Sequence, residues 1–445
     1  MKVCINSQTP LLRFNLSYNE LLEKYGWLDD PLDISSLEEG VDYGTSPGGV
    51  TAMVQPLMQY MMQKGYISDA VWVSLGVNYP PRVRLDRLLL SHIEFEERQL
   101  KEYTMFKESL WASIHGLGAS SIAGYRSYAH YNWVSAAELL EHVGKVDIFY
   151  VQDFQQLLTG QLIGPAAPAV LRWHVPFTPE NFNPLFHKFV LKAMEGFDAV
   201  VVSTRRDLEG LIKSSYHGRA HQIYPFIDPA GWEQPPPSAV SAMSERIGLG
   251  KDEKLLLMVA RMDRMKSHDT AIRALARLPG RVKLVLIGNG SFSSSRKGGL
   301  GHGKGSAWRA ELELLAKDLH VEDRVVFLGY VTQEELRAAY SLASAVVLTS
   351  KVEGFGIAVL ESWANRKPVV VSSGAGASEL VVDGSNGYTF PAGDDEQLAQ
   401  RLNQALGAKG DAMGTVGYET AKQCTLDLAA ERERAVLEET AARYS

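Results

Sequence analysis

The chain has 445 residues, which is too long for one ordinary domain and long enough for two. Its hydrophobic fraction of 45% and charged fraction of 22% are typical of a soluble globular enzyme, and its net charge of −7 has the wrong sign for a nucleic-acid-binding surface. Two cysteines, Cys4 and Cys424, provide neither a disulfide framework nor a metal cluster and fit a reducing compartment. The first residues indicate a strand rather than a signal peptide, and no apolar run approaches the length of a membrane span. We therefore expect a cytoplasmic protein that binds no nucleic acid and does not insert into a membrane.

The first half of the chain alternates short apolar runs with longer helical patterns. Strands that alternate with helices build parallel sheets covered on both faces, so we expect an α/β domain here. The strand-like runs are 71–75, 146–151, 169–173 and 199–203, and the helical patterns include 95–114 and 185–195.

An insertion and a pair of glycines follow the first strand. The segment 13–47 is unusually long for a strand–helix connection, and we expect it to fold over the ligand-binding cleft or to mediate contacts. Gly48 and Gly49 then precede a helical stripe that Pro56 is expected to kink. Residues 80–90 carry arginines beside apolar side chains, which favours either a membrane-touching helix or a salt-bridged surface.

Two polar residues follow strand-like runs of the first half. Asp153 comes just after the run that ends at residue 151, and His174 comes directly after the run that ends at 173. Ligands of open α/β sheets bind beyond the carboxyl ends of the strands, so His174 is a candidate site residue. Asp153 is a candidate because a carboxylate can orient the hydroxyl groups of a ligand. The alternatives are a carboxylate that caps a loop and a histidine with a structural role.

A proline-rich segment at residues 225–237 separates the two halves. Proline is unsuited to the interior of a helix or of a central strand, so this segment predicts an interdomain linker. We expect a first domain over residues 1–230, a second over 231–425, and a C-terminal helix within 426–445. Two parallel sheets that face each other would place the active site in the cleft between the domains.

The second half opens with a strand followed by two cations. After the apolar run 255–259 come Arg261 and, five residues later, Lys266. Arginine supplies a planar fork of donors and lysine a point charge, and both are common on phosphates. A pair of solvated surface cations is the alternative. Residues 291–306 form a basic loop rich in Gly and Ser, which either closes over phosphates or is simply mobile.

Two glutamates flank a glycine turn after the apolar run 345–350. The turn leads into a helical pattern over residues 357–366. Helix N-termini expose unpaired N–H groups that suit an anionic or polyhydroxylated ligand, and glycine lets a ligand approach the backbone. Taken alone, the segment is equally compatible with solvated glutamates. The candidate residues are Glu353, Gly354, Phe355, Gly356, Ile357 and Glu361.

Together these segments resemble the retaining glycosyltransferases of family 4, which have the GT-B fold of two Rossmann-like domains. The spacing of Arg261 and Lys266 and the spacing of Glu353 and Glu361 carry the resemblance, which is close over residues 255–393 and looser before them. It implies that the two cations stabilise the charge of a departing nucleoside diphosphate. It also implies that Glu353 lies at the donor sugar, that Glu361 holds the ribose hydroxyls, and that the turn between them contacts the donor.

In the first domain the resemblance implies that Gly48 and Gly49 contact the donor phosphates or the acceptor, and that His174 contacts the donor sugar. It also implies that the C-terminal helix within residues 426–445 packs back on the first domain. Asp153 matches the His-Asp-x-Gln segment of trehalose-forming members, but Gln152 stands in place of that His. The subgroup that this chain resembles most is therefore the trehalose glycosyltransferring synthases, and the departure leaves the acceptor open.

The resemblance predicts transfer of a hexosyl group, with glucosyl favoured, from a nucleoside-diphosphate sugar to an acceptor hydroxyl with retention of configuration. The favoured acceptor is small and soluble, such as glucose, which would give a trehalose-type product. The alternatives are a lipid or cell-surface glycan acceptor, a non-catalytic scaffold that binds sugar nucleotides, and an epimerase or phosphorylase of the same fold. No Asp-x-Asp metal signature lies at a plausible strand end, so we expect no required metal or cofactor; Mg²⁺ on the diphosphate and a homo-oligomer stay open.

Overall fold

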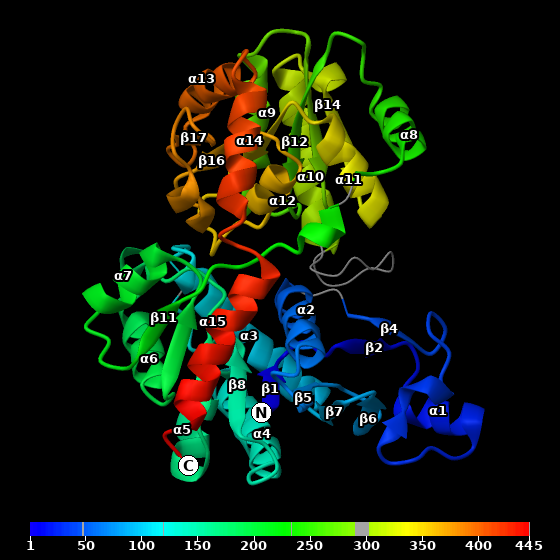
Figure 1. The fold of residues 1–445 in the computed structure, drawn as a ribbon, viewed down its shortest axis with the longest axis vertical. Helices are drawn as coiled ribbons and strands as arrows, with labels where there is room; N and C mark the ends of the chain where they lie inside the picture. Colours follow the sequence, from blue (N-terminus) through cyan, green and yellow to red (C-terminus); the bar gives the residue numbers. More distant parts are fainter. Residues whose placement is uncertain (47–48, 119, 233, 290–301, 445) are drawn as a thin grey trace. The chain divides into compact units, whose positions relative to one another are not determined.

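The computed structural model describes residues 1–46, 49–118, 120–232, 234–289 and 302–444 (Figure 1). Two compact units make up the chain, namely Met1–Tyr224 with Ala429–Ser445, and Pro225–Leu428. The divisions fall a few residues from the expected boundaries at 230 and 425, and the C-terminal segment belongs to the first unit.

Within the described part of the first unit, nine strands form one sheet in the order β11-β10-β9-β8-β1-β5-β7-β6-β3. Neighbours run parallel except β6 and β7, which pair antiparallel. The strands β8, β9 and β10 are buried along their length and mostly apolar, as expected of a parallel sheet covered on both faces, although β8 ends in Gln152 and β9 in Arg172. The strands are β1 (Lys2–Ser7), β3 (Leu32–Asp33), β5 (Asp69–Leu75), β6 (Arg82–Leu85), β7 (Leu88–Ile93), β8 (Ile148–Gln152), β9 (Ala169–Arg172), β10 (Ala199–Val202) and β11 (Ala220–Gln222).

The helices of the first unit bury an aromatic core. Tyr103 and Phe106 of α3 pack against Tyr128 and Tyr131 of α4, and all four side chains are at most 2% exposed. The sequence pattern predicted α3 and α6 close to their observed bounds, whereas α4 was not predicted. The helices are α1 (Tyr18–Tyr25), α2 (Gly49–Gln63), α3 (Glu97–Ile114), α4 (Tyr125–Leu140), α5 (Thr159–Ile163), α6 (Pro184–Met194), α7 (Arg205–Lys213) and α15 (Leu426–Ala441).

Residues 13–47 hold regular structure of their own. Strands β2 (Leu12–Phe14) and β4 (Tyr43–Thr45) pair antiparallel, with α1 and β3 between them in the chain. The buried Asp42 accepts hydrogen bonds from Lys24 Nζ at 2.6 Å, from Tyr25 Oη at 2.5 Å and from Glu38 N at 2.9 Å. This carboxylate therefore ties α1 to the chain that leads into β4.

Residues 80–90 are a β-hairpin, so the membrane-touching helix considered for them is wrong. β6 and β7 pair antiparallel around Asp86, which has a φ of 51°. Along β6 the side chains alternate between exposed Arg82 and Arg84 and buried Val83, which is the period of a strand and not of a helix. Arg82 forms an ion pair with Asp30 at 2.5 Å, which agrees with the salt-bridged alternative.

In the second unit, the described residues form a six-stranded parallel sheet in the order β14-β13-β12-β15-β16-β17. Its core contains the apolar side chains of β12, β13 and β15 with those of α9 and α13. The strands are β12 (Lys254–Val259), β13 (Val282–Ile287), β14 (Val325–Gly329), β15 (Ala345–Leu348), β16 (Val369–Ser372) and β17 (Gly387–Phe390). The helices are α8 (Pro237–Ile247), α9 (His268–Ala276), α10 (His302–Asp318), α11 (Gln333–Leu342), α12 (Ala358–Ala364), α13 (Asp395–Ala405) and α14 (Gly410–Ala421).

The C-terminal helix α15 is held on the first unit by a buried ion pair. Glu433 Oε1 lies 3.2 Å from Arg172 Nε of the central strand β9, and both side chains are 2% exposed. Tyr150 Oη donates to Glu433 Oε2 at 2.9 Å, and the remaining Arg172 nitrogens donate to backbone carbonyls of Val202 and Ile223. Because every polar atom of the pair has partners, the helix is fixed on the sheet despite the desolvation of two charges.

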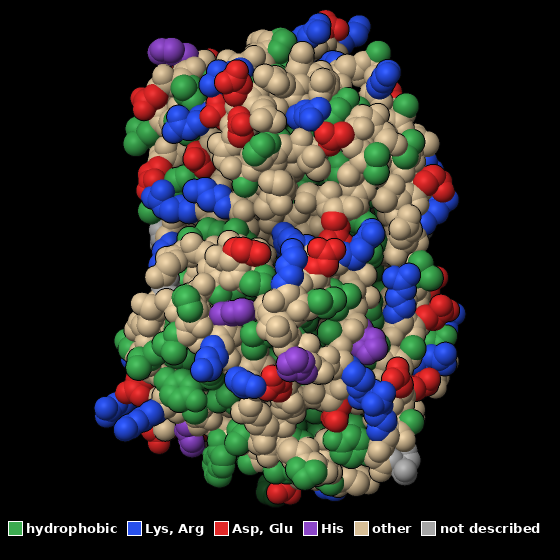
Figure 2. Space-filling model, turned by 90° about the vertical axis from the view of Figure 1, so that its left-hand side faces the viewer, with side chains coloured by type: hydrophobic (Ala, Val, Ile, Leu, Met, Phe, Trp, Pro, Cys, Tyr) green, Lys and Arg blue, Asp and Glu red, His purple; other side chains and the backbone are tan. Residues whose placement is uncertain are grey.

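The surface carries charges of both signs. Figure 2 shows one face of the molecule, on which Lys and Arg side chains are interspersed with Asp and Glu side chains. Across the described residues, every helix is too short or too polar to cross a lipid bilayer.

Candidate functional site

Two neighbouring strands of the second sheet end in the loops that carry the candidate site. β12 pairs parallel with β15, so their carboxyl ends lie at the same edge of the sheet. The loop after β12 carries Arg261 and Lys266, and the loop after β15 carries Glu353. The structure therefore brings together three residues that lie up to about ninety positions apart in the sequence.

Backbone and hydroxyl hydrogen bonds join these two loops. The Thr349 hydroxyl donates to the carbonyls of Lys266 at 2.7 Å and Ser267 at 2.9 Å. Lys351 N donates to the carbonyl of Met265 at 2.8 Å. Lys266 is thus anchored to the glutamate loop by its backbone as well as by its side chain.

Local caps and a glycine shape the loop that carries Arg261. Asp263 accepts from Met265 N at 2.8 Å, which begins the short turn of helix that ends at Lys266. The same carboxylate lies 3.6 Å from Arg261 Nη1. Gly288, at the end of the neighbouring β13, has a φ of 138°, and a Cβ there would lie 2.0 Å from the carbonyl oxygen of Ala260. A side chain at position 288 would therefore displace the loop.

Glu353 is the centre of the cluster. Its carboxylate accepts from Lys266 Nζ through Oε1 and from the Ser350 hydroxyl through Oε2, the latter at 2.5 Å. The side chains of Lys266 and Glu353 are 15% and 18% exposed, so this ion pair is largely screened from water.

The surrounding charges keep Glu353 ionised. Burial alone would raise the pKa of Glu353, but Lys266, Ser350 and Arg261 outweigh it and hold that pKa below its ordinary value. Two cations, Arg261 and Lys266, thus face two carboxylates, Asp263 and Glu353. A phosphate that binds these cations has to compete with the protein's own carboxylates.

The glycine turn after Glu353 is fixed by its neighbours. Gly356 has a φ of 101°, and a Cβ there would lie 2.5 Å from Leu348 Cδ2, so only glycine fits. The carbonyl of Phe355 accepts from Ala377 N at 2.8 Å, and the Phe355 side chain is buried. Gly354 lies between Glu353 and Phe355 in this turn.

Helix α12 is shorter than predicted. It spans Ala358–Ala364 rather than residues 357–366, because Arg366 takes a left-handed φ of 55° that a helix cannot continue through. Ile357 occupies its N-cap position, is 39% exposed and offers no side-chain cap. The partial charge of such a short helix gives weaker support for an anion site than the predicted helix would.

Glu361 lies in the first turn of α12 and has a different hydrogen-bond donor from Glu353. Its Oε2 accepts from the hydroxyl of Tyr340 on α11 at 2.5 Å. Burial raises the pKa of Glu361, and the hydrogen bond from Tyr340 offsets only part of that rise. The ring of Tyr340 packs edge-on against Trp232 with centroids 5.2 Å apart.

In the first unit, Asp153 and His174 lie together at the ends of the paired strands β8 and β9. The backbone N–H of His174 donates to Asp153 Oδ1 at 3.2 Å. Asp153 has a φ of 65°, an unusual conformation for a residue other than glycine. Burial raises the pKa of Asp153 to about 7, although backbone N–H groups of His174, Phe154 and Val175 oppose the rise.

The environment of His174 selects one neutral form of its ring. Gln152 Nε2 donates to the carbonyl of Tyr150 at 3.2 Å, which leaves Gln152 Oε1 facing His174 Nε2 at 3.0 Å. The Nε2 atom therefore carries the ring proton, and Nδ1 is left as an acceptor. Burial, with a smaller contribution from Arg172, lowers the pKa of His174 to about 3, so the ring is neutral under ordinary conditions.

The glycine pair after the insertion is only partly described. Gly49 is the first residue of α2, and Gly48 lies outside the described residues, as does most of the predicted basic loop 291–306. Pro56 lies inside α2, which continues through it to Gln63.

Four residues that contact the candidate site were not identified from the sequence as site residues. Ser350 is the last residue of an apolar run and carried no separate signal, whereas Gln152 was noted only as a departure from a motif. Tyr340 and Trp232 lie in other elements, and only the folded chain shows that Tyr340 contacts Glu361 and that Trp232 packs against Tyr340.

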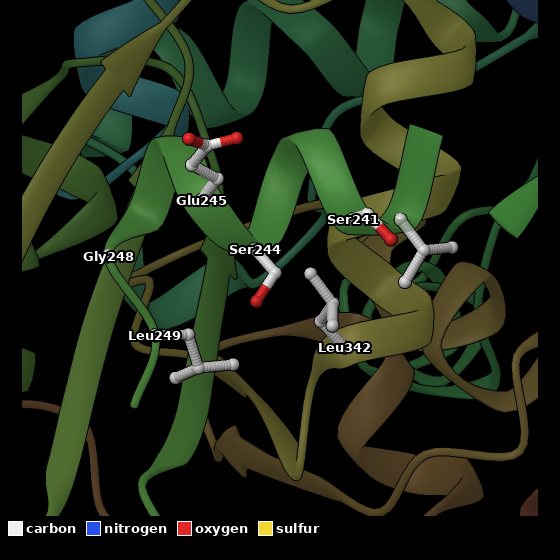
Figure 3. Close-up of a pocket in the computed structure, with 7 residues that line it drawn as sticks. Ser241, Ser244, Glu245, Gly248, Leu249 and Leu342 are labelled. Carbon is white, nitrogen blue, oxygen red and sulfur yellow. The ribbon is translucent and has the colours of Figure 1, made fainter. Parts of the chain in front are cut away.

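A hollow of about 570 Å³ on the second unit does not contain these residues (Figure 3). It lies between α8 and the end of α11 and is lined by residues such as Ser241, Ser244 and Leu342. In the described part of the chain, no group of three or more His, Cys, Asp or Glu side chains is placed to hold a metal ion.

Comparison with known proteins bears on the second unit most directly. Residues 241–419 match the family described as glycosyl transferases group 1. The matched segment lies entirely within the second unit and contains Arg261, Lys266, Glu353 and Glu361.

Two curated relatives extend this likeness. The D-inositol 3-phosphate glycosyltransferase of Xylanimonas cellulosilytica is 33% identical over 218 residues, which are 48% of this chain and 49% of that protein. This chain thus spans about half the length of the first relatives that it matches. The N-acetyl-alpha-D-glucosaminyl L-malate synthase of Bacillus anthracis is 24% identical over 383 residues, which are 83% of this chain and 87% of that protein.

A solved structure covers almost the whole chain. The UDP-forming alpha,alpha-trehalose-phosphate synthase of Burkholderia xenovorans, in complex with glucose-6-phosphate, aligns with a TM-score of 0.75 and 15% identity. The alignment covers 98% of this chain and 99% of that one. This likeness confirms the predicted fold class: α/β with two Rossmann-like parallel-sheet domains of the GT-B type.

Proposed function

We propose that this protein is a retaining glycosyltransferase of family 4 that moves a hexosyl group from a nucleoside-diphosphate sugar to an acceptor hydroxyl. The observation that carries the proposal is the cluster of Arg261, Lys266 and Glu353 at adjacent strand ends, inside the segment that matches the glycosyl transferases group 1 family. The rival reading of these side chains as solvated surface charges does not agree with a Lys266–Glu353 pair that is more than four-fifths buried.

The donor is proposed to be a UDP-hexose, with UDP-glucose first. The related structure is UDP-forming by its description, which supports this choice. Lys266 and Arg261 would stabilise the negative charge that develops on the departing diphosphate, an effect that is strongest where water is excluded. Glu361, with Oε2 already held by Tyr340, would accept from the ribose hydroxyls.

Retention is proposed to follow the front-face route, in which the departing diphosphate itself takes the proton of the acceptor hydroxyl. Glu353 is held as a carboxylate by Lys266 and Ser350, so it is suited to orient and stabilise positive charge on the donor sugar rather than to donate a proton. A pair of carboxylates working as acid and nucleophile, as in glycosidases, would need one of them protonated close to the other. Here Glu361 accepts from Tyr340, while Glu353 is paired with Lys266.

The acceptor is proposed to be small and soluble, with glucose as the first candidate. The names of the similar proteins include the compounds D-inositol 3-phosphate, L-malate and glucose-6-phosphate, which are all small and hydroxylated. His174 and Asp153 would contact the transferred sugar and the acceptor, and Gly48 and Gly49 the donor phosphates. Mg²⁺ is proposed to help only through the diphosphate, and a cytoplasmic location is part of the same proposal.

The test is one screen of sugar nucleotides with and without acceptors, in which released nucleoside diphosphate is measured. We expect release from UDP-glucose that rises severalfold with one of glucose, glucose-6-phosphate, inositol 3-phosphate or malate, and a product with the anomeric configuration of the donor. Release only with vesicles that carry glycolipid acceptors would favour the lipid alternative. Binding of a sugar nucleotide without release under any condition would favour the non-catalytic scaffold.

A further inference from the structure

The two carboxylate oxygens of Glu361 have different environments, because Tyr340 donates a hydrogen bond to one of them. Oε2 accepts from the Tyr340 hydroxyl at 2.5 Å, while Oε1 has no hydrogen-bond donor among the described residues. The Glu361 side chain is partly exposed, so Oε1 is the oxygen through which this carboxylate can accept from a ligand. Its backbone carbonyl is also engaged, by Asn365 Nδ2 at 2.8 Å.

Tyr340 is itself rigidly placed. Its side chain is fully buried, and its ring is packed against Trp232 at an interplanar angle of 87°. Helix α11 starts with a capping box in which Thr332 and Glu335 satisfy each other's backbone N–H groups. The hydroxyl of a tyrosine held in this way has one position, and the carboxylate oxygen that accepts from it has one position as well.

A fixed carboxylate is suited to a pair of neighbouring hydroxyls. Ordering a glutamate side chain on binding costs about 1–2 kcal/mol of conformational entropy, and a partner that has already ordered it removes much of that cost. The tyrosine also opposes protonation, because it donates to the charged form in a site where burial favours the neutral form.

We propose that Tyr340 is the positioning residue of Glu361: its hydroxyl occupies Oε2, so that Oε1 is presented to a vicinal diol, the chemistry of a ribose. Trp232, in the segment that enters the second unit, braces the tyrosine ring. The inference rests on the proposed function, which supplies the nucleotide as the ligand, but it names a residue that no motif contains.

The experiment compares two ligands that differ only in the diol. The affinities of UDP and of 2′,3′-dideoxy-UDP are measured by calorimetry for the wild type, Tyr340→Phe and Tyr340→Met. We expect both variants to weaken UDP about tenfold and dideoxy-UDP less than about twofold, because the lost hydrogen bond from Tyr340 positions the carboxylate that contacts the diol and no other part of the ligand. Tyr150→Phe is the matched control, since it removes a buried Tyr–Glu hydrogen bond elsewhere, to Glu433 in the first unit, and should change neither affinity.

The possible results separate the inference from the proposed function. Equal weakening of both ligands in the Tyr340 variants would mean that the tyrosine only supports the fold, and would overturn the inference while the proposed function stands. Unchanged affinity for both ligands would overturn it in the same way. A wild-type protein that binds none of UDP, GDP and ADP would overturn the proposed function, and the inference would fall with it. Thermal unfolding of each variant shows whether folding is intact. Tyr340→Met places a second apolar side chain in the buried position of the tyrosine ring, so the result does not depend on one variant.

Discussion

Replacing Lys266 by methionine should destabilise the second unit by an amount that the structure fixes. The side chains of Lys266 and Glu353 are 15% and 18% exposed, so water and salt screen the pair much less than a surface pair. Removing one partner of a buried ion pair typically costs about 3–5 kcal/mol. Ser350 and Arg261 would still contact or face the remaining carboxylate, so we expect the lower end of that range, about 3 kcal/mol near neutral pH.

The size of this loss should depend on pH. In the wild type the pKa of Glu353 lies below its ordinary value, so its contribution to stability is present above the unfolded pKa of about 4.3 and is lost as pH falls through the folded pKa. Without Lys266 burial dominates, and the folded pKa of Glu353 lies above the unfolded value. The variant is then destabilised at neutral pH, and this penalty disappears once Glu353 is protonated in both states. The difference between wild type and Lys266→Met should therefore shrink toward about pH 4.

Urea unfolding followed by circular dichroism at neutral and at acidic pH measures both effects. The double variant Lys266→Met with Glu353→Gln should recover more than half of the loss, because no buried charge remains unpaired. Lys101→Met is the matched control: Lys101 and Glu97 also form an ion pair, but their side chains are 74% and 81% exposed, so no measurable loss is expected. An equal loss at both pH values without recovery in the double variant would refute the reasoning.

The other predictions concern activity, protonation and the C-terminal helix. Arg261→Ala should lower turnover more than about 100-fold in the diphosphate-release assay, by analogy with removal of an oxyanion donor, and near-normal turnover would count against its role. His174, with a pKa of about 3, should show no titration between about pH 5 and pH 8 in histidine-selective NMR, and an imidazolium signal in that range would contradict the buried neutral ring. Glu433→Ala leaves Arg172 buried and unpaired and should cost about 3–5 kcal/mol in urea unfolding, whereas a change below about 1 kcal/mol would show that the helix is held mainly by apolar contacts.

The alternating strands and helices of both units could be predicted because their hydrophobic patterns are strong and local. Runs such as 199–203 and 255–259 are short and rich in Val and Leu, and each is a buried parallel strand in the structure. Helix α4 was missed because its buried face consists mostly of tyrosines, serines and an asparagine, with Ala136 and Leu139 as its aliphatic members. Residues 80–90 were ambiguous because three arginines beside leucines fit either a helix or a hairpin until the partner strands are known.

The candidate site could be predicted only where spacing in the sequence carries it. Arg261, Lys266 and Glu353 follow strands, and parallel neighbours bring strand ends together, so their proximity follows from the fold. The pairing of Lys266 with Glu353 does not follow from the spacing in the sequence, because it depends on the conformation of the two loops that carry these residues. Tyr340 could not be found at all, since it contacts Glu361 through packing between two helices.

The ion pair between Lys266 and Glu353 affects how a diphosphate would bind. A donor whose phosphates contact Lys266 has to draw the ammonium group away from Glu353. Lys266 is the strongest of the groups that lower the pKa of Glu353, so its departure should let burial raise that pKa toward and above the ordinary value. Binding should then be accompanied by uptake of a fraction of a proton in mildly acidic buffer.

Calorimetric titration of UDP-glucose in buffers of different ionisation enthalpy measures this uptake directly. The ligand is a diphosphate diester without a titrating proton near neutral pH, so a proton taken up must bind to the protein. We expect uptake by the wild type near pH 5.5 that grows as the pH falls toward the ordinary pKa of a glutamate, about 4.3, and none by Glu353→Gln, which cannot be protonated in this range. Binding without uptake would show that Lys266 stays on Glu353 in the complex. In that case Arg261 would have to carry the diphosphate charge alone, and the assignment of Lys266 to the leaving group would be wrong.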